Sequence, residues 1–295
     1  EDTEPATGGT ATTTRKLGAE AVQKKGRWRA WKWLLLRRVT QLALLGLFLL
    51  GPLAGIWIVR GSFAASMTLH FLPLTDPLIL AQSFLAGHAL AATALLGALI
   101  VIVFYVVVGG RAYCAWTCPM NLITDAAAWL NRRLDLRKNI SISRAIRYWL
   151  LGAILVLAWL TGTVVWEWLN PVTVFQRGLL FGMGLGWVMV AAIFVFDLLV
   201  VRRGWCGHLC PVGALHSVLG YFSLVRVKAA GREHCADCLD CFVVCPEPQV
   251  IGPSLKGGEG SSPLIDSGNC LNCGRCIDIC PHEVFQFSTR FGRRT

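Results

Sequence analysis

Charged residues are scarce in this sequence of 295 residues. Asp, Glu, Lys and Arg make up only 15% of it, whereas hydrophobic residues make up 55%. A typical soluble domain has about 25% charged and about 45–50% apolar residues, so a soluble chain of this composition could not cover its surface. A disordered chain is excluded as well, because such chains are poor in apolar residues and rich in charge. The composition therefore predicts an integral membrane protein.

Acidic residues are the scarcer of the two charged kinds. There are 17 of them against 28 Lys and Arg, which gives a net charge of +11. Such an excess can indicate nucleic-acid binding. Membrane proteins, however, also concentrate Lys and Arg in their cytoplasmic segments, and the basic residues here flank apolar stretches. We therefore expect the membrane as a partner and no nucleic acid.

Motifs for several cofactors are missing. No Cys-x-x-Cys-His occurs, which excludes a covalently attached c-type haem. No Gly-x-Gly-x-x-Gly follows a strand, which excludes a dinucleotide-binding fold. Of the six histidines only His88 lies in an expected membrane span, so a b-type haem held by two histidines on facing helices is not expected.

Four uncharged stretches are long enough to cross a bilayer, which takes about 20 apolar residues. They cover residues 39–59, 77–110, 148–166 and 178–196. The second stretch is too long for one span. We therefore expect it to form a periplasmic or re-entrant lead-in followed by a helix over residues 84–108.

Basic residues in the loops predict how these spans are oriented. Arg60 is the only one between the first and second spans, and Arg177 is the only one between the third and fourth. Seven lie between the second and third spans: Arg111, Arg132, Arg133, Arg137, Lys138, Arg144 and Arg147. Because Lys and Arg collect on the cytoplasmic side, we expect a multi-pass protein with both termini in the cytoplasm.

All 12 cysteines belong to spaced clusters, and the first two clusters form an internal repeat. Tyr113-Cys114-x3-Cys118-Pro119 ends the second span, and Trp205-Cys206-x3-Cys210-Pro211 ends the fourth, 92 residues later. An amphipathic stretch follows each proline, and proline is favoured at the first position of a helix. We expect two repeated helical hairpins, each followed by a short helix at the cytoplasmic face.

The four cysteines of this repeat allow two interpretations: Cys114, Cys118, Cys206 and Cys210. One is a pair of structural thiol pairs at the membrane surface. The other, which we favour, is that the repeat symmetry brings the four together on a metal, on a cluster or as a redox-active dithiol. A helix that begins at each proline would place its positive end near the sulfurs and favour the thiolate form.

Eight further cysteines carry the most specific motif. Cys235-x2-Cys238-x2-Cys241-x3-Cys245-Pro246 is followed by Cys270-x2-Cys273-x2-Cys276-x3-Cys280-Pro281. This is the doubled spacing of two-cluster bacterial ferredoxins, in which the fourth cysteine of each motif binds the other cluster. Zinc is the alternative for Cys-x2-Cys pairs, but the doubled spacing favours two [4Fe–4S] clusters. The predicted ligands are Cys235, Cys238, Cys241 and Cys280 for the first cluster, and Cys245, Cys270, Cys273 and Cys276 for the second.

The predicted fold class is an α-helical polytopic membrane protein with four transmembrane helices in two repeated hairpins. A C-terminal α+β domain similar to a two-cluster bacterial ferredoxin follows. We expect a disordered and then basic cytoplasmic segment over residues 1–38, a four-helix membrane domain over residues 39–227 and the ferredoxin-like domain over residues 228–295.

Together, the four spans, the paired Cys-x3-Cys-Pro motifs and the doubled ferredoxin motif resemble the NapH family over about residues 35–295. This family is the membrane-bound ferredoxin-type quinol dehydrogenase subunit of periplasmic nitrate reductase systems. The resemblance implies a protein of the bacterial cytoplasmic (inner) membrane that oxidises quinol and passes electrons toward a periplasmic reductase in nitrate respiration. It also implies two partners, a periplasmic iron–sulfur protein and a membrane-anchored multihaem cytochrome.

Related families share this core. They are the ferredoxin-type protein of methylamine utilisation, the regulator-like flavoprotein of nitrous oxide respiration and a copper-reducing assembly factor for cytochrome oxidase. The nitrous oxide protein carries a large N-terminal flavin domain, and the copper-reducing factor carries an extra C-terminal β domain. Neither is present in these 295 residues, so we expect a nitrate-type or methylamine-type protein.

Two functions fit this pattern. The first is a quinol dehydrogenase subunit that acts with partner proteins. The alternative is a reductive maintenance or assembly factor that delivers cytosolic electrons through the membrane to a periplasmic metalloenzyme. The two functions run electrons in opposite directions through the same cofactors.

Quinol oxidation releases two protons, so a quinol site needs a proton acceptor, usually His or a carboxylate. His88 is the candidate quinol contact, with a helix-packing hydrogen bond as the equal alternative. We expect Asp197 to pair with Arg202 or Arg203 near the interface. Three further ionisable residues are expected to be ordinary loop residues: His70, Asp76 and Glu167.

Overall fold

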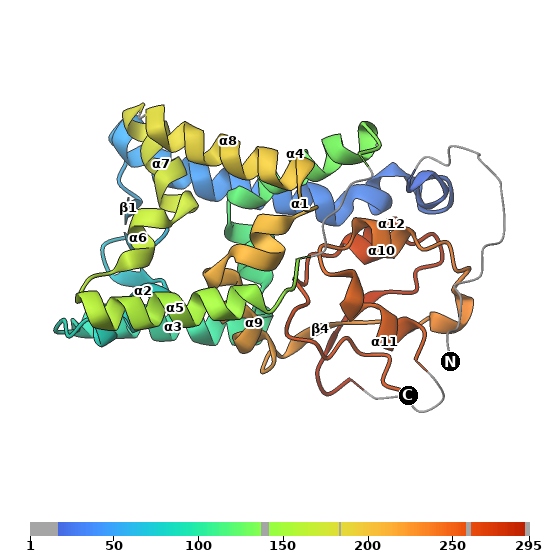
Figure 1. Cartoon of the computed structure of the whole chain (residues 1–295). Coiled ribbons are helices and arrows are strands. Elements are labelled where there is room, and N and C mark those ends of the chain that lie inside the picture. The colour runs from blue at the N-terminus through green and yellow to red at the C-terminus, as the bar shows by residue number, and fades with distance from the viewer. Residues whose placement is uncertain (1–16, 137–141, 183, 258–260, 293–295) are drawn as a thin grey trace.

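The computed structural model, which describes residues 17–136, 142–182, 184–257 and 261–292, forms a helical domain and a smaller ferredoxin-like domain (Figure 1). The helical domain runs from α1 to α9, and the ferredoxin-like domain begins at strand β4. Residues 1–16, most of the segment expected to be disordered, lie outside the described residues.

Helix α1 (Ala19–Ala54) is 36 residues long and contains both the basic segment and most of the first expected span. Residues 19–38, which belong to the segment expected to be disordered and then basic, are therefore helical except at Gly26, where the backbone (φ 78°) breaks the helix. The reason is packing against the ferredoxin-like domain. The Asp278 carboxylate accepts hydrogen bonds from the backbone N–H groups of Trp33 (3.2 Å) and Leu34 (2.9 Å), and the Trp33 ring meets the Phe287 ring edge-on at 4.8 Å between centroids.

Three strands and three helices complete the first half of the helical domain. The strands form an antiparallel sheet in the order β1-β2-β3, in which Met67 pairs with Arg60 on one side and Pro73 on the other. In chain order the elements are β1 (Val59–Gly61), β2 (Ala65–Thr68), β3 (Leu72–Thr75), α2 (Pro77–Leu85), α3 (Ala92–Val108) and α4 (Met120–Arg133).

The second half repeats this order of helices, with α7, α8 and α9 in the places of α2, α3 and α4. Its elements are α5 (Ile146–Thr161), α6 (Val165–Leu169), α7 (Pro171–Phe181), α8 (Gly184–Leu199) and α9 (Pro211–Gly220). Even the helix starts match. The Oδ1 atoms of Asp76 and Asn170 cap α2 and α7 by accepting the N–H groups of Leu78 (2.8 Å) and Val172 (3.1 Å). Proline follows each capping residue, so the repeat extends beyond the cysteine motifs.

Among the described residues, only α1 is long and apolar enough by itself to cross a membrane. The other expected spans correspond to the shorter apolar helices α3, α5 and α8, of 17, 16 and 16 residues. Two of the expected spans are shortened by a break in the backbone. Gly87 (φ 78°) separates α2 from α3, and Gly182 (φ 66°) separates α7 from α8. Helix length therefore does not establish the predicted count of four spans.

The ferredoxin-like domain packs against one end of the helical domain, opposite β1 and α6 (Figure 1). Strands β4 (Val225–Lys228) and β5 (Gln286–Thr289) pair antiparallel. Short helices carry the cysteine loops between them: η3 (Arg232–His234), α10 (Asp240–Val244), η4 (Pro248–Val250), α11 (Gly252–Leu255) and α12 (Arg275–Ile279). Its apolar core includes Val227, Ile251, Ile265, Val284 and Phe285.

Candidate iron–sulfur centres

Four cysteines surround one cavity in the ferredoxin-like domain and are here called the first site: Cys235, Cys238, Cys241 and Cys280. Cys235 and Cys238 lie in the loop that leads into α10, Cys241 lies in α10, and Cys280 follows α12. Asp237 and Asp240 also line this cavity. The structure thus brings together the four residues that the crossed ferredoxin pattern assigns to the first cluster.

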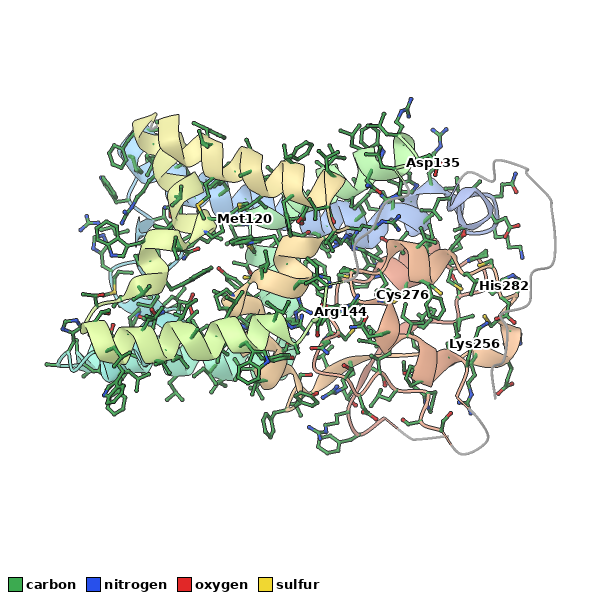
Figure 2. All side chains as sticks on the ribbon, in the orientation of Figure 1. Met120, Asp135, Arg144, Lys256, Cys276 and His282 are labelled. Carbon is green, nitrogen blue, oxygen red and sulfur yellow. The ribbon has the colours of Figure 1, made fainter. Side chains whose placement is uncertain are left out.

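The other four cysteines of this domain also lie together and are called the second site: Cys245, Cys270, Cys273 and Cys276 (Cys276 is labelled in Figure 2). Cys245 interacts electrostatically with Cys270 and Cys273, and Cys276 interacts in the same way with Cys245, Cys270 and Cys273. Cys245 thus lies among the cysteines of the other motif, as the crossed pattern requires.

The arrangement of the sulfurs suits a cluster better than a single ion. All 12 cysteines are free thiols. Among the described residues, no three Cys, His, Asp or Glu side chains lie close enough to hold one metal ion. Around zinc all ligands meet one atom, whereas in a [4Fe–4S] cluster each thiolate binds a different iron. The thiolate sets therefore fit iron–sulfur clusters.

The cysteines of the internal repeat, here called the repeat cysteines, surround a cavity inside the helical domain: Cys114, Cys118, Cys206 and Cys210. Each pair brackets a wide π-type turn. The N–H of Cys118 donates to the Tyr113 carbonyl at 3.0 Å, and the N–H of Cys210 donates to the Trp205 carbonyl at 2.9 Å. Such turns occur most often at functional sites. The structure thus brings all four sulfurs to one cavity.

Helix N-termini converge on this cavity from both halves. Met120 and Val212, at the starts of α4 and α9, line it together with the capping residues Asp76 and Asn170 of α2 and α7. Because helix N-termini carry partial positive charge, this arrangement favours an anionic group such as a thiolate-bound cluster.

Two buried glutamines show how the halves are related. Gln82 on α2 accepts the N–H of Trp166, which precedes α7, at 3.0 Å. Gln176, at the matching place on α7, accepts the N–H of Phe63, which precedes α2, at 3.2 Å. Trp166 and Phe63 both line the cavity. These reciprocal bonds indicate an approximate twofold relation between the halves, with the repeat cysteines around the axis.

The other ionisable candidates differ in how far they match expectation. His88 is exposed in residues 86–91, between α2 and α3, and does not line the cavity. Asp76, expected to be a loop residue, caps α2 and does line it. Asp197 is buried and accepts the N–H of Trp205 at 2.9 Å rather than forming an ion pair with Arg203. Glu167 lies on α6 and His70 in a turn between strands.

The repeat cysteines lie beside the second site. Cys114 and Cys273 are buried in one apolar cluster with Ala115 and Leu271. Beside this cluster, the indole N–H of Trp116 donates a hydrogen bond to the carbonyl of Asn272, which lies between Leu271 and Cys273, at 3.0 Å. The two cysteine sites thus meet across the interface between the two domains.

A buried ion group also ties the domains together. Glu247, which follows Cys245-Pro246, is fully buried and contacts Arg111 (2.5 Å), Arg147 (2.9 Å) and Arg144, which Figure 2 shows at the junction of the domains. Burial alone would raise the pKa of Glu247, but Arg111, Arg147 and Arg144 outweigh it and lower the pKa to about 2. The carboxylate is therefore ionised at any physiological pH.

Equivalent arginines of the two repeats reach the second site. Arg111 donates to the Asn269 carbonyl (3.2 Å), next to Cys270, and Arg203 donates to the Val244 carbonyl (3.1 Å), next to Cys245. Each arginine stands three residues before the first cysteine of its motif. That shared spacing is a sequence signal that could have identified them.

Family profiles match both parts of the chain. A profile described as "4Fe-4S binding domain" matches residues 90–137 and 183–229, which contain the repeat cysteines. A profile described as "4Fe-4S dicluster domain" matches residues 234–284, which contain the first and second sites. No solved structure matches the chain.

Relatives align over nearly the whole chain. "Methylamine utilization ferredoxin-type protein MauN" of Methylorubrum extorquens is 54% identical over 92% of this chain and 94% of that protein. "Ferredoxin-type protein NapH" of Escherichia coli is 49% identical over 95% of this chain and 98% of that protein. "Putative electron transport protein YccM" of Escherichia coli is 23% identical over 86% and 75%.

These matches agree with the thiolate sets in the structure, and they identify an iron–sulfur protein of the ferredoxin type. The chain belongs to the family of NapH and MauN ferredoxin-type proteins.

Proposed function

We propose that the protein is an electron-transfer subunit of the bacterial cytoplasmic membrane that oxidises quinol and passes electrons toward a periplasmic reductase of the nitrate type. The observation that carries the proposal is the position of the repeat cysteines. They surround one cavity within the helical domain and lie directly beside the second site of the ferredoxin-like domain. Cysteine sites therefore lie next to one another from the interior of the helical domain to the ferredoxin-like domain.

The cofactors follow from the three thiolate sets. The first and second sites each hold one [4Fe–4S] cluster, which exchanges electrons one at a time. The repeat cysteines hold an additional metal or cluster, or act as dithiols. The helix N-termini around them suit an anionic group.

We further propose four membrane spans, with both termini in the cytoplasm. Support comes from large apolar side chains that are exposed on the short helices, such as Leu99 on α3, Trp149 on α5 and Val188 on α8. A soluble protein rarely exposes extended apolar surface, whereas lipid-facing helices do. On this proposal, α2 and α7 are re-entrant helices that complete the spans of α3 and α8.

We propose that quinol is oxidised beside the cavity of the repeat cysteines. This step releases two electrons, which the group held by the repeat cysteines accepts, and two protons. Asp76 is the carboxylate that lines the cavity, so we assign it as an acceptor for one of these protons. His88, the sequence candidate, is exposed away from the cavity. A periplasmic iron–sulfur protein and a membrane-anchored multihaem cytochrome are the proposed electron-accepting partners.

Anaerobic reconstitution of the full-length protein into quinone-free vesicles tests this function. Added quinol should reduce the iron–sulfur clusters, as followed by their visible absorbance and by electron paramagnetic resonance. A protein that dithionite reduces but quinol does not would favour the reductive assembly function, in which electrons enter from the cytosol.

A further inference from the structure

A group of arginines surrounds the second site with too few carboxylates to balance it. Asp125 on α4 contacts Arg38, Arg203 (3.3 Å) and Arg275 (2.7 Å). Arg37 is buried beside the same carboxylate. The arginines hold the pKa of Asp125 well below its usual range, although burial alone would raise it. Asp125 is thus the carboxylate that these arginines share, while Asp278 interacts electrostatically with Arg37 and Asp197 with Arg203.

The unbalanced charge points toward the cysteines. Arg203 and Arg275 both interact electrostatically with Cys245 and Cys273. Arg37 interacts with Cys273. Burial, and then repulsion by Arg275, lowers the pKa of both Arg37 and Arg203 to about 10. The structure therefore stores excess positive charge beside the second site.

Unpaired donors indicate what balances this charge. Among the described residues, buried nitrogen atoms of Arg37, Arg203 and Arg275 have no hydrogen-bond acceptor. Buried donors without an acceptor are costly, and an anionic group beside them would supply acceptors. A [4Fe–4S] cluster with its four thiolate ligands carries net negative charge. A cluster bound at the second site would therefore balance the arginines.

The first site has a different environment. Lys256 interacts electrostatically with Cys235 and Cys241. Its side chain is half exposed, and its Nζ forms an ion pair with Oδ1 of Asp237 at 2.9 Å. Lys24, which contacts His282 at the rim, is also exposed. Figure 2 shows Lys256 on the outer side of the ferredoxin-like domain. Water screens these charges far more than the buried arginines.

We propose that Arg37, Arg203 and Arg275 hold the second cluster at a higher reduction potential than the first. The inference rests on the two-cluster part of the proposed function. Reduction adds one negative charge, which nearby buried positive charge stabilises, and cluster potentials depend on surrounding charge and solvent exposure. An electron in the ferredoxin-like domain therefore resides on the cluster beside the helices. In quinol-dependent reduction the second cluster is therefore reduced before the first.

An anaerobic redox titration of the full-length protein, followed by electron paramagnetic resonance, tests this order. The signal that is lost in Cys245→Ser identifies the second cluster, and it should appear at the higher potential. Arg37→Gln should lower the potential of that cluster and leave the first unchanged. Arg37→Lys, which keeps the charge, should restore the wild-type value. Arg133→Gln, which removes an exposed charge from α4, is the matched control and should shift neither cluster.

Equal potentials in the wild type, or a higher potential for the first cluster, would overturn the inference. So would equal shifts in Arg37→Gln and Arg37→Lys, because these would indicate a packing role rather than a charge effect. Absence of one cluster from the wild-type protein would instead contradict the proposed function. With the signals assigned by Cys245→Ser, the wild-type order of potentials decides the matter even where an Arg37 variant fails to fold.

Discussion

Cys114 of the first repeat and Cys273 of the ferredoxin-like domain are buried in the same apolar cluster. The two residues are far apart in the sequence and belong to different motifs, yet they bring the repeat cysteines and the second site into contact. Electron transfer between two redox sites requires such proximity. On the proposed function, this pair is the point at which electrons pass between the two sites.

Crossed ligation makes the loss of one cysteine specific to one cluster. Wild-type protein purified without oxygen should contain at least about eight iron and eight acid-labile sulfide for two clusters. Cys245→Ser should lose the second cluster and keep the first, although Cys245 belongs to the first motif. Cys280→Ser should do the reverse. Iron analysis with electron paramagnetic resonance would contradict the pattern if each variant lost the cluster of its own motif.

Asp76→Asn separates proton transfer from helix capping. The substituted amide keeps an acceptor for the N–H of Leu78, and Asn170 already performs that role at the start of α7. The variant should therefore fold with its clusters intact. Quinol-dependent cluster reduction should slow by about 100-fold or more, the usual contribution of a proton acceptor, while reduction by dithionite is unchanged. His88→Gln is the control and should behave as wild type.

Glu247→Gln should destabilise the contact between the two domains. The substitution leaves Arg111 and Arg147 buried with no carboxylate partner, and breaking a buried ion pair costs about 3–5 kcal/mol. Thermal unfolding in detergent should show this as a large decrease in midpoint temperature. Asp237→Asn, which removes the exposed partner of Lys256, should cause little change. Equal midpoints for the two variants would disprove the role of Glu247.

The same carboxylate predicts a pH dependence. The folded pKa of Glu247 is about 2, below its ordinary value of 4.5. Its contribution to stability is therefore complete above about pH 4.5 and is lost as the pH falls toward 2. Wild-type stability should decline over this window, and the decline should be smaller in Glu247→Gln.

Reporter fusions test the proposed membrane topology. Fusions after Gly55 or Gly87, at the ends of α1 and α2, should report a periplasmic location. Fusions after Asp135, at the end of α4, or at the C-terminus should report a cytoplasmic one. A periplasmic C-terminus would invert the proposed geometry, because the first and second sites would then face the periplasm.

Local spacing predicted the parts of the site that lie within motifs. The doubled ferredoxin spacing indicated which cysteines group together, and Pro119 and Pro211 correctly indicated that helices follow the repeat cysteines. Helix α1 was only partly predicted. Its basic half is helical because Asp278 and Phe287, residues of another domain, hold it in place.

Residues that reach the site through the tertiary fold could not be predicted. Asp76 lines the cavity because β3 leads into a short helix that starts there, and nothing in its sequence surroundings indicates a neighbouring cysteine. Glu247 and Asp125 are single acidic residues whose arginine partners come from distant segments. His88 was one of two equal interpretations because it lies in an expected span, but its place in the structure is the loop between α2 and α3.

The most direct test of the account is quinol-dependent cluster reduction in variants of the repeat cysteines. Cys118→Ser and Cys210→Ser should each abolish reduction by quinol while both ferredoxin-type clusters remain assembled and reducible by dithionite. Because residues that act as one unit show non-additive losses, the double variant should be no worse than either single one. Single variants that keep near-normal quinol-dependent reduction would contradict the account and leave these cysteines a structural role.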